Sequence, residues 1–402
     1  MKKSLYITGL LYLFLYMFPF PFMFSFTNVL DPIVYFIGRK VFNINMFRQE
    51  HIYALDTTYE YVKVVTLFLI SIILGTLVQV LFSKRVKFDL IYNSTVLYAR
   101  YFVGLLIIEY GITKVCGAQF NTPGYIKLES TFGESSPMGL LWTFMEASRP
   151  YTIFVGLLQV FSGTLILFKR TTILGSLLTF IVMFNILMMN LCYDVPAKIF
   201  SIHLLLLSGL IAAPEIKTVY SFFILRVPVQ LPPIQKAESK YRLAQPILKG
   251  LFIGGYVVFC IQHFIHFPLT KNLGAELSEM DGVYKTDLFV IENDTLPSLT
   301  SDSVRWKSLI ISKGISAVTK MTDSAEKYNV TIDSISKTIM FVSKSSSDEN
   351  YKLKYSQESD KFRFEGLWKG KKMLALFSKK NYNDYPLINR GFHWITDTLY
   401  NR

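Results

Sequence analysis

Long uncharged stretches separated by short polar connections fill the first two thirds of the chain. A helix rises about 1.5 Å per residue, so roughly 20 apolar residues cross the hydrocarbon core of a bilayer. Several stretches reach this length on their own, and shorter ones reach it with their flanks. We predict about seven membrane-spanning helices. They lie within residues 4–30, 64–83, 96–115, 150–168, 171–193, 199–213 and 250–267.

The first apolar stretch follows Lys2 and Lys3, as the apolar region of a secretory signal peptide would. It is longer than such a region, and no small-x-small cleavage motif follows Phe26. We therefore expect a retained membrane anchor. Residues 29–60 mix basic and aromatic side chains and are predicted to be re-entrant or to lie at the membrane interface.

Past Pro268 the period of the pattern changes from that of helices to that of strands. In 351–355 (YKLKY) and 361–367 (KFRFEGL) apolar and charged residues alternate, which gives a strand one buried and one wet face. About eight such segments favour a small up-and-down antiparallel β-barrel of lipocalin-like architecture, and a two-sheet sandwich is the alternative. The segments are 282–291, 304–312, 315–321, 328–333, 337–342, 351–356, 361–367 and 372–378.

These patterns predict a mainly α-helical integral membrane protein that ends in a small antiparallel β domain. The expected parts are N-terminal membrane helices with an interfacial segment (1–94), a four-helix core (95–213), a basic connection (214–246), a last span (247–268) and a β domain with a C-terminal tail (269–402). The tail, with Phe392, His393 and Trp394, is expected to pack on the β domain or on the membrane surface.

The composition agrees with a membrane part in lipid and a β domain in water. Of the 402 residues 51% are hydrophobic and 18% are charged, which excludes a disordered chain and disfavours a purely soluble one. Residues 269–402 hold 20 of the 42 Lys and Arg and 17 of the 29 Asp and Glu. The basic connection would lie along an anionic membrane face, so the net charge of +13 needs no nucleic-acid partner.

The distribution of basic residues predicts the orientation. With the N-terminus in the cytoplasm, the inner segments hold 14 of the Lys and Arg outside the β domain and the outer segments hold 8. An odd number of spans then places the C-terminal β domain in the periplasm. We therefore expect a multi-pass protein of a bacterial inner membrane.

Polar side chains within the predicted spans are the candidate functional residues, because an ionisable group in hydrocarbon is costly unless it faces a partner inside the bundle. Most of them fall toward the outer side, which predicts an outward-facing polar pocket roofed by loop 117–149. The alternative is that they only join helices. The candidate ligand-binding residues are Arg100, Glu109, Lys114, Gln119, Gln159, Asn190, Asp194, Lys198 and His203.

Cysteine and histidine positions add two weaker hypotheses. Cys116 and Cys192 are both predicted at the outer surface, where either a disulfide or two separate thiols can occur. His203, His263 and His266 lack an acidic fourth ligand at a fixed spacing, so we predict no metal site. The sequence has no nucleophile elbow, Walker A loop, HExxH or CxxC motif, and it leaves open whether the chain is an enzyme.

Ala99-Arg100-Tyr101 is followed by Glu109-Tyr110-Gly111-Ile112-Thr113-Lys114, and a later span contains the stretch from Gly156 to Gly163. With these motifs, residues 95–213 resemble the DoxX-like family of small four-helix membrane proteins. The segment from Asn190 to Pro196, with Lys198 and His203, is similar to larger DoxX-like proteins of Bacteroidetes that carry extra helices and a C-terminal domain. A more distant similarity links the helices to the membrane domain of vitamin K-dependent carboxylases.

The resemblance implies an inner-membrane core, and for some members a place in quinone-linked or thiol-linked redox complexes. The leading hypothesis is therefore an accessory subunit of envelope redox metabolism whose pocket binds a quinone or another lipidic molecule. The alternative is a non-enzymatic anchor whose periplasmic β domain binds a cell-envelope protein. A third hypothesis is carboxylase-like catalysis, with Lys114 or Lys198 as the base.

Overall fold

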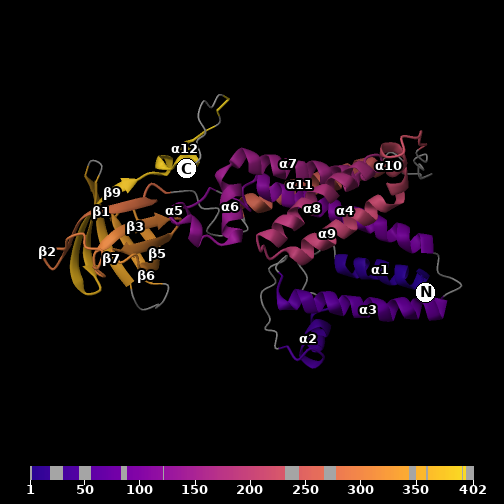
Figure 1. The fold of residues 1–402 in the computed structure, drawn as a ribbon, viewed down its shortest axis with the longest axis horizontal. Helices are drawn as coiled ribbons and strands as arrows, with labels where there is room; N and C mark the ends of the chain where they lie inside the picture. Colours follow the sequence, from indigo (N-terminus) through magenta and orange to yellow (C-terminus); the bar gives the residue numbers. More distant parts are fainter. Residues whose placement is uncertain are drawn as a thin grey trace. The chain divides into compact units, whose positions relative to one another are not determined.

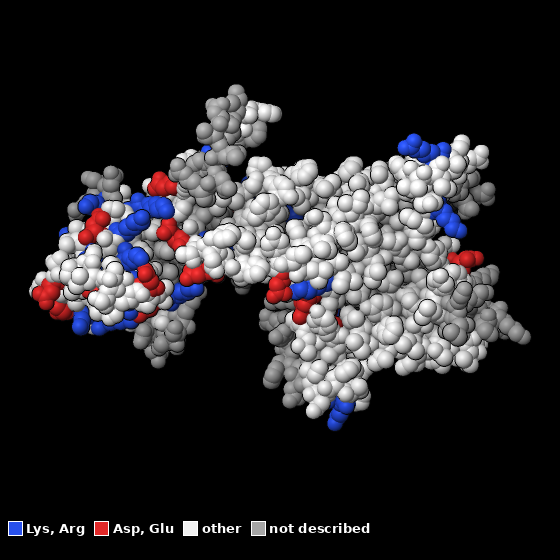
Figure 2. Space-filling view, in the orientation of Figure 1, with Lys and Arg blue, Asp and Glu red and all other residues white. Residues whose placement is uncertain are grey.

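The chain forms two compact units (Figure 1). The computed structural model describes residues 2–18, 30–44, 56–82, 88–120, 122–230, 244–266, 278–343, 350–358, 361–391 and 393–394. The first unit comprises 1–116 and 150–266, and the second comprises 117–149 and 267–402. Figure 2 shows that charged side chains are sparse over the helices and dense over the strands, as expected of one part in lipid and one part in water.

The described part of the first unit is helical. Its helices are α1 (Lys2–Met17), α2 (Asp31–Lys40), α3 (Thr58–Phe82), α4 (Phe88–Val115), α7 (Arg149–Leu167), α8 (Thr172–Cys192), α9 (Lys198–Ala212), the 3-10 turn η2 (Ala213–Glu215), α10 (Ile216–Phe223) and α11 (Ala244–His266). Six helical stretches are long and apolar enough to cross a membrane, which confirms a multi-pass membrane protein. They are Thr58–Leu81, Phe88–Val115, Arg149–Leu167, Thr172–Cys192, Lys198–Phe223 and Pro246–His266.

The N-terminal part differs in detail from the prediction. The apolar stretch of α1, Leu5–Met17, is shorter than the six long stretches, and 19–29 lie outside the described residues. Within the predicted interfacial segment, α2 is a regular helix, and α3 already begins at Thr58. The charges of Glu60 and Lys63 do not prevent this early start, because the two side chains pair one turn apart at 3.3 Å.

Four glycines bring α4 and α7 into close antiparallel contact. A Cβ atom on Gly111 would lie 2.6 Å from the carbonyl oxygen of Gly156, and one on Gly163 would lie 2.7 Å from the carbonyl oxygen of Gly104. The glycines are seven residues apart on each helix, so both contacts lie on one face. Small residues at such positions let membrane helices approach each other closely. Buried side chains of α1, α4, α7, α8 and α9 form a common core beside this contact.

Gly111→Ala is therefore expected to destabilise the helical unit by about 1–3 kcal/mol, because the added methyl group meets backbone. Gly255→Ala is the matched control, since no atom lies within 4 Å of its added Cβ and both substitutions gain the same helix propensity. Thermal unfolding of the purified protein in detergent, followed by circular dichroism, measures the difference. Equal unfolding midpoints for the two variants would contradict the close contact.

The second unit contains a closed antiparallel β-barrel, as the alternating pattern predicts. Successive strands pair with each other, and β1 also pairs with β9, from Val283 opposite Lys380 to Ile291 opposite Met373. β2 is a two-residue extension that pairs with the end of β1. The strands are β1 (Gly282–Ile291), β2 (Asp294–Thr295), β3 (Trp306–Ser312), β4 (Ile315–Lys320), β5 (Ala325–Asp333), β6 (Thr338–Ser343), β7 (Asn350–Glu358), β8 (Lys361–Trp368) and β9 (Lys371–Lys380). Closure confirms the barrel and excludes the sandwich.

Aromatic side chains fill the barrel interior. Every second residue of the strands points inward, and many of these residues are large rings. The Trp306 ring lies 4.8 Å from that of Trp368 and 5.7 Å from that of Phe289, between ring centroids. The interior is therefore a packed core of side chains. Its fully buried rings include Tyr284, Phe289, Trp306, Phe341, Phe364 and Phe377.

Two segments of the same unit pack on the outer face of β1, β3 and β4 near one end of the barrel, and we call it the capped end. The segments are α5 (Tyr125–Leu128) and residues 382–389, which form η3 (Tyr382–Asp384) and α12 (Pro386–Asn389), and they contact Val283, Ile310 and Ala317. The backbone N–H of Tyr125 donates to Ser312 Oγ at 3.1 Å, and Lys380 Nζ donates to Glu129 at 2.8 Å. The start of the C-terminal tail thus packs on the barrel, as predicted. Phe392 and 395–402 lie outside the described residues.

Segment 117–149, which the sequence analysis assigned to the helical core, thus belongs to the compact unit of the barrel. It also contains η1 (Phe132–Glu134) and α6 (Pro137–Ala147). Within it, Lys127 Nζ donates to the buried Glu146 at 2.8 Å. Burial raises the pKa of Glu146, and the hydrogen bond from Lys127 partly offsets this.

The other end of the barrel, which carries turns 321–324 and 369–370, holds a charged network around Glu326. We call it the free end. Glu326 accepts hydrogen bonds from Lys320 at 2.7 Å and from Tyr328 at 2.6 Å. Lys369 Nζ donates to the same carboxylate at 3.1 Å. Burial raises the pKa of Glu326, but the hydrogen bonds from the three donors lower it by a larger amount, so that it falls to about 2.

This network makes barrel stability depend on pH. The pKa of Glu326 in the folded state lies below its ordinary value of 4.5, so its stabilising effect is complete above about pH 4.5 and is lost as the pH falls toward 2. Glu326→Gln is expected to flatten the pH dependence of unfolding in that window. Acid titration of both proteins, followed by near-ultraviolet circular dichroism, measures the effect. Identical titration profiles would show that Glu326 does not contribute.

Candidate membrane site

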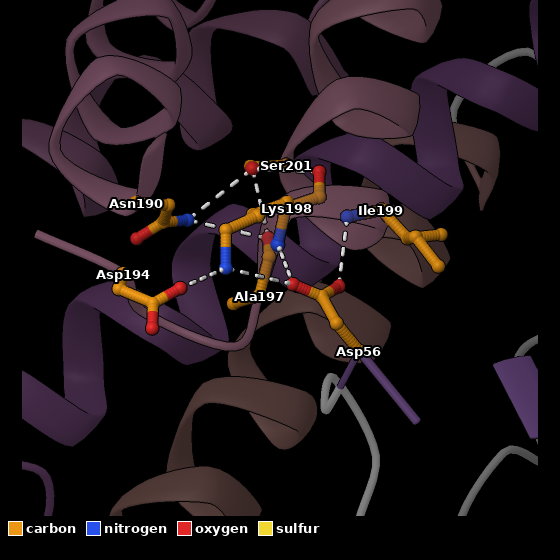
Figure 3. A network of polar contacts seen from close by, with 7 residues as sticks. All are labelled: Asp56, Asn190, Asp194, Ala197, Lys198, Ile199 and Ser201. Carbon is orange, nitrogen blue, oxygen red and sulfur yellow. Dashed lines mark hydrogen bonds and ion pairs between the residues drawn. The ribbon is translucent and has the colours of Figure 1, made fainter. Parts of the chain in front are cut away.

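A polar network joins the start of α9 to the end of α8 and to Asp56, which lies two residues before α3 (Figure 3). The Asp56 carboxylate accepts hydrogen bonds from the backbone N–H groups of Lys198 at 2.8 Å and Ile199 at 3.0 Å. Lys198 Nζ lies 3.8 Å from Asp56 and donates to Asp194 at 2.9 Å. The ammonium group of Lys198 is thus held between two carboxylates, which stabilise its charged form and disfavour a role as a general base.

Asp56 supplies a cap that α9 cannot supply for itself. The first N–H groups of a helix have no partner within the helix, and a neighbouring side-chain oxygen usually accepts from them. Here the N-cap residue is Ala197, which has no such oxygen. The Asp56 carboxylate takes its place from 142 residues away along the chain. It also lies at the positive end of the α9 dipole.

Asn190 joins α8 to α9 in the same network. Its Nδ2 donates to the carbonyl oxygen of Ala197 and to Ser201 Oγ, both at 3.2 Å. Asn190 thus has the helix-joining role that is the alternative to ligand binding. Of the predicted site residues, the structure therefore brings together Asn190, Asp194 and Lys198. Asp56 is absent from the predicted set, although the uncapped start of α9 at Ala197 signals the need for such a partner.

His203 of α9 contacts two tyrosines of α1. Its Nδ1 donates to the carbonyl oxygen of Ile199 at 2.7 Å, so Nε2 accepts from the Tyr12 hydroxyl at 2.6 Å in the neutral ring. The Tyr16 ring stacks on the imidazole with 3.7 Å between centroids. Both ring nitrogens are thus engaged within the bundle. Sequence reasoning missed Tyr12 and Tyr16, which sit in an uncharged run of aromatic and aliphatic residues.

Glu109 and Lys114 have different neighbours although they lie on the same helix. Glu109 is 6% exposed and accepts a hydrogen bond from the Tyr256 hydroxyl of α11 at 2.7 Å. Lys114 is also buried, and its Nζ donates to the carbonyl oxygen of Tyr110 at 3.4 Å. Both groups face the bundle interior, as their cost in lipid requires.

The remaining predicted residues lie elsewhere. Arg100 donates to the carbonyl oxygens of Ile166 and Leu167 at the end of α7, 14 residues before Lys114 on α4. Gln159 is 1% exposed on α7, and its Oε1 has no hydrogen-bond partner among the described residues. Gln119 belongs to the second unit, and its buried Oε1 likewise has no such partner. The nine candidates thus fall into several groups.

No disulfide joins Cys116, which is half-buried, to Cys192, which is exposed. Among the described residues no group of three or more His, Cys, Asp or Glu side chains is placed to hold a metal ion. A cavity of about 370 Å³ lies beside α2, and none of the predicted site residues lines it. Its lining residues are Asp31, Pro32, Tyr35 and Arg39.

These features define a multi-pass helical membrane protein with an attached, filled β-barrel. No family model matches the chain, and no solved structure matches it. It is similar to the uncharacterized protein YwoB of Bacillus subtilis (strain 168), with 31% identity over 98 residues. These residues are 24% of this chain and 60% of YwoB, so the chain spans less than two thirds of that relative.

Proposed function

We propose that the helical unit anchors the β-barrel unit in a bacterial inner membrane, and that the barrel binds a protein of the cell envelope through its outer surface. The observation that carries this proposal is the filled interior, in which Tyr284, Phe289 and Trp306 are all buried among other rings. A barrel whose interior is occupied by its own side chains recognises partners from outside. The polar groups of the helical network support an anchoring role, because they cap and join helices.

The free end of the barrel is the surface that we propose for the partner. At the capped end, the unit's own segments already cover the outer face of β1, β3 and β4, with polar contacts made by Tyr125 and Glu129. The turns of the free end carry charges of both signs, such as Asp323 and Lys369. A mixed-charge rim favours a partner of complementary pattern over a uniformly acidic or basic one. We further propose a periplasmic location for the barrel, which is supported by the excess of Lys and Arg in the inner connections.

The test is site-specific photo-crosslinking in living cells. A photo-reactive residue replaces Lys371, which is exposed beside turn 369–370, or Lys354, which is exposed on β7 opposite Glu365. We expect a discrete crosslinked product from position 371 and much less from position 354. The partner is then identified by mass spectrometry of the product. Absence of any product from position 371 and from further positions in turn 321–324 would overturn the proposal.

A second candidate function is binding of a quinone or another lipidic molecule by a DoxX-like core. The observation that favours it is the Glu109 carboxylate, which is buried in a membrane helix and hydrogen-bonded to the neutral Tyr256 hydroxyl. Such a carboxyl group can accept and return a proton when a bound molecule is reduced or oxidised. The shared core of α4, α7, α8 and α9 also supports a four-helix unit of this kind.

Purification in mild detergent followed by lipid extraction tests the second candidate. We expect a quinone to co-purify with the unaltered protein and to be lost in Glu109→Gln. Glu60→Gln is the control, because its carboxylate pairs with Lys63 at the start of α3. If the extract of the unaltered protein contains no quinone, this candidate is eliminated and the anchoring proposal is unaffected.

A further inference from the structure

Two cationic side chains from different helices converge on the last carbonyl groups of α7. Arg100 of α4 donates from Nε and Nη2 to the carbonyl oxygen of Ile166, and from Nη2 to that of Leu167, all at 3.3 Å. Lys249 of α11 donates to the same carbonyl oxygen of Leu167. Lys169 and Arg170 follow directly in the connection to α8. Four basic residues thus gather at one end of the helical unit.

The helix end neutralises only part of this charge. The carboxyl end of a helix behaves like roughly half a negative charge, which accounts for the attraction of one cation. Arg100 and Lys249 each carry a full charge, and no ion pair among the described residues joins either of them to a carboxylate. Uncompensated charges that are half-buried in a membrane protein call for an anion.

The surroundings of Lys249 indicate where that anion would come from. Its ammonium group lies 5.4 Å from the centre of the Tyr101 ring and 5.2 Å from that of Phe168. On α11, Leu248 and Leu251 flank it and are exposed on the outside of the helices. Aliphatic side chains that are exposed in a membrane-spanning helix face acyl chains. The cations therefore lie where an apolar, lipid-facing surface ends, which is the level of phospholipid headgroups.

We propose that Arg100, Lys249 and Lys169 form a binding site for the phosphate group of an anionic phospholipid. The phosphate oxygens accept from the N–H groups of Arg100 and Lys249 that the α7 carbonyls do not use, and Lys169 adds charge from the connection. The acyl chains lie over Leu248 and Leu251. The ligand holds α4, α7 and α11 together at this end of the helices, independently of what the barrel binds.

The experiment compares lipid retention by the full-length protein after removal of bound lipid in detergent. Phosphatidylglycerol or phosphatidylcholine with identical acyl chains is added at equal mole fraction, and retained lipid is counted by native mass spectrometry. We expect clear preference for phosphatidylglycerol. Lys249→Gln is expected to lower retention about fivefold, which corresponds to about 1 kcal/mol for one basic residue near the surface. Equal retention of the two lipids would overturn the proposal.

Two further variants keep the test decisive. Lys169→Gln removes charge from an exposed side chain and is expected to lower retention without disturbing the contacts with α7, so it serves if Lys249→Gln does not fold. Lys217→Gln, an exposed basic residue near the start of α10, is the matched control and should leave retention unchanged. An equal loss of phosphatidylglycerol retention in Lys217→Gln would show general charge attraction in place of a specific site, and would overturn the proposal. If millimolar inorganic phosphate abolishes phosphatidylglycerol retention, the ligand is free phosphate, and the proposal of a lipid headgroup is wrong.

Discussion

Trp306→Ala is expected to destabilise the barrel by about 3–5 kcal/mol, a large share of the stability of a small domain. Trp306 is 1% exposed and lies among the rings of Phe289, Trp368 and Phe377. Truncation removes the apolar contacts of the indole and leaves a cavity that surrounding strands cannot close, because the barrel is tied by hydrogen bonds on both sides of β3. Hydrogen exchange of the β3 and β4 amides in the full-length protein measures the loss.

Trp394→Ala is the matched control, because that side chain is 90% exposed. It removes the same group from water instead of from a core, so the expected change is within about 0.5 kcal/mol. Exchange rates of the two variants that differ by less than tenfold would contradict a tightly packed interior, and with it the observation on which the proposed function rests.

Asp56→Ala is expected to destabilise the start of α9 by about 1–3 kcal/mol. The change leaves the backbone N–H groups of Lys198 and Ile199 without an acceptor and removes one of the two carboxylates beside the Lys198 ammonium group. Thermal unfolding in detergent and hydrogen exchange of the first turn of α9 report the effect. Asp56→Asn, which keeps one carbonyl oxygen for capping, should recover part of the stability.

Asp194→Ala separates capping from ion pairing. Asp194 also pairs with Lys198, but its side chain is 85% exposed. Exposed ion pairs contribute little, so this variant should lose less than about 1 kcal/mol. If both variants lose the same stability, the Lys198 ion pair outweighs the cap, and the assigned role of Asp56 is wrong.

The types of the elements were predictable because a helix in lipid needs a long uncharged run, whereas a strand with one face in water alternates apolar and polar residues. Strands such as 361–367 follow from alternation, and uncharged runs such as 150–168 mark helices within one or two residues. The start of α3 was missed because Glu60 and Lys63 end the uncharged run, although the helix tolerates them as a pair. The same limitation hid α2, whose ten residues include Arg39 and Lys40.

For the candidate site, the sequence predicted which polar side chains are buried, but not which side chains they contact. Glu109, Lys114 and His203 are buried, as expected of polar groups that cannot face lipid. Which groups meet depends on how helices far apart in sequence are rotated about their axes, and periodicity within one helix does not contain that information. Tyr256, the partner of Glu109, and Tyr12, the partner of His203, lie on other helices and were not among the candidate residues.

Pairing of β1 with β9 makes the barrel one of the last parts of the chain that can fold during synthesis. Its seam stays open until Lys380 has been made, and Glu129 precedes its partner Lys380 by 251 residues. At about 5–20 residues per second, that contact waits roughly 12–50 seconds after Glu129 leaves the ribosome's catalytic centre. Once β1 has been made, its edge stays unpaired until β9 follows, so a ribosome stalled before β9 would release a chain prone to edge-to-edge aggregation.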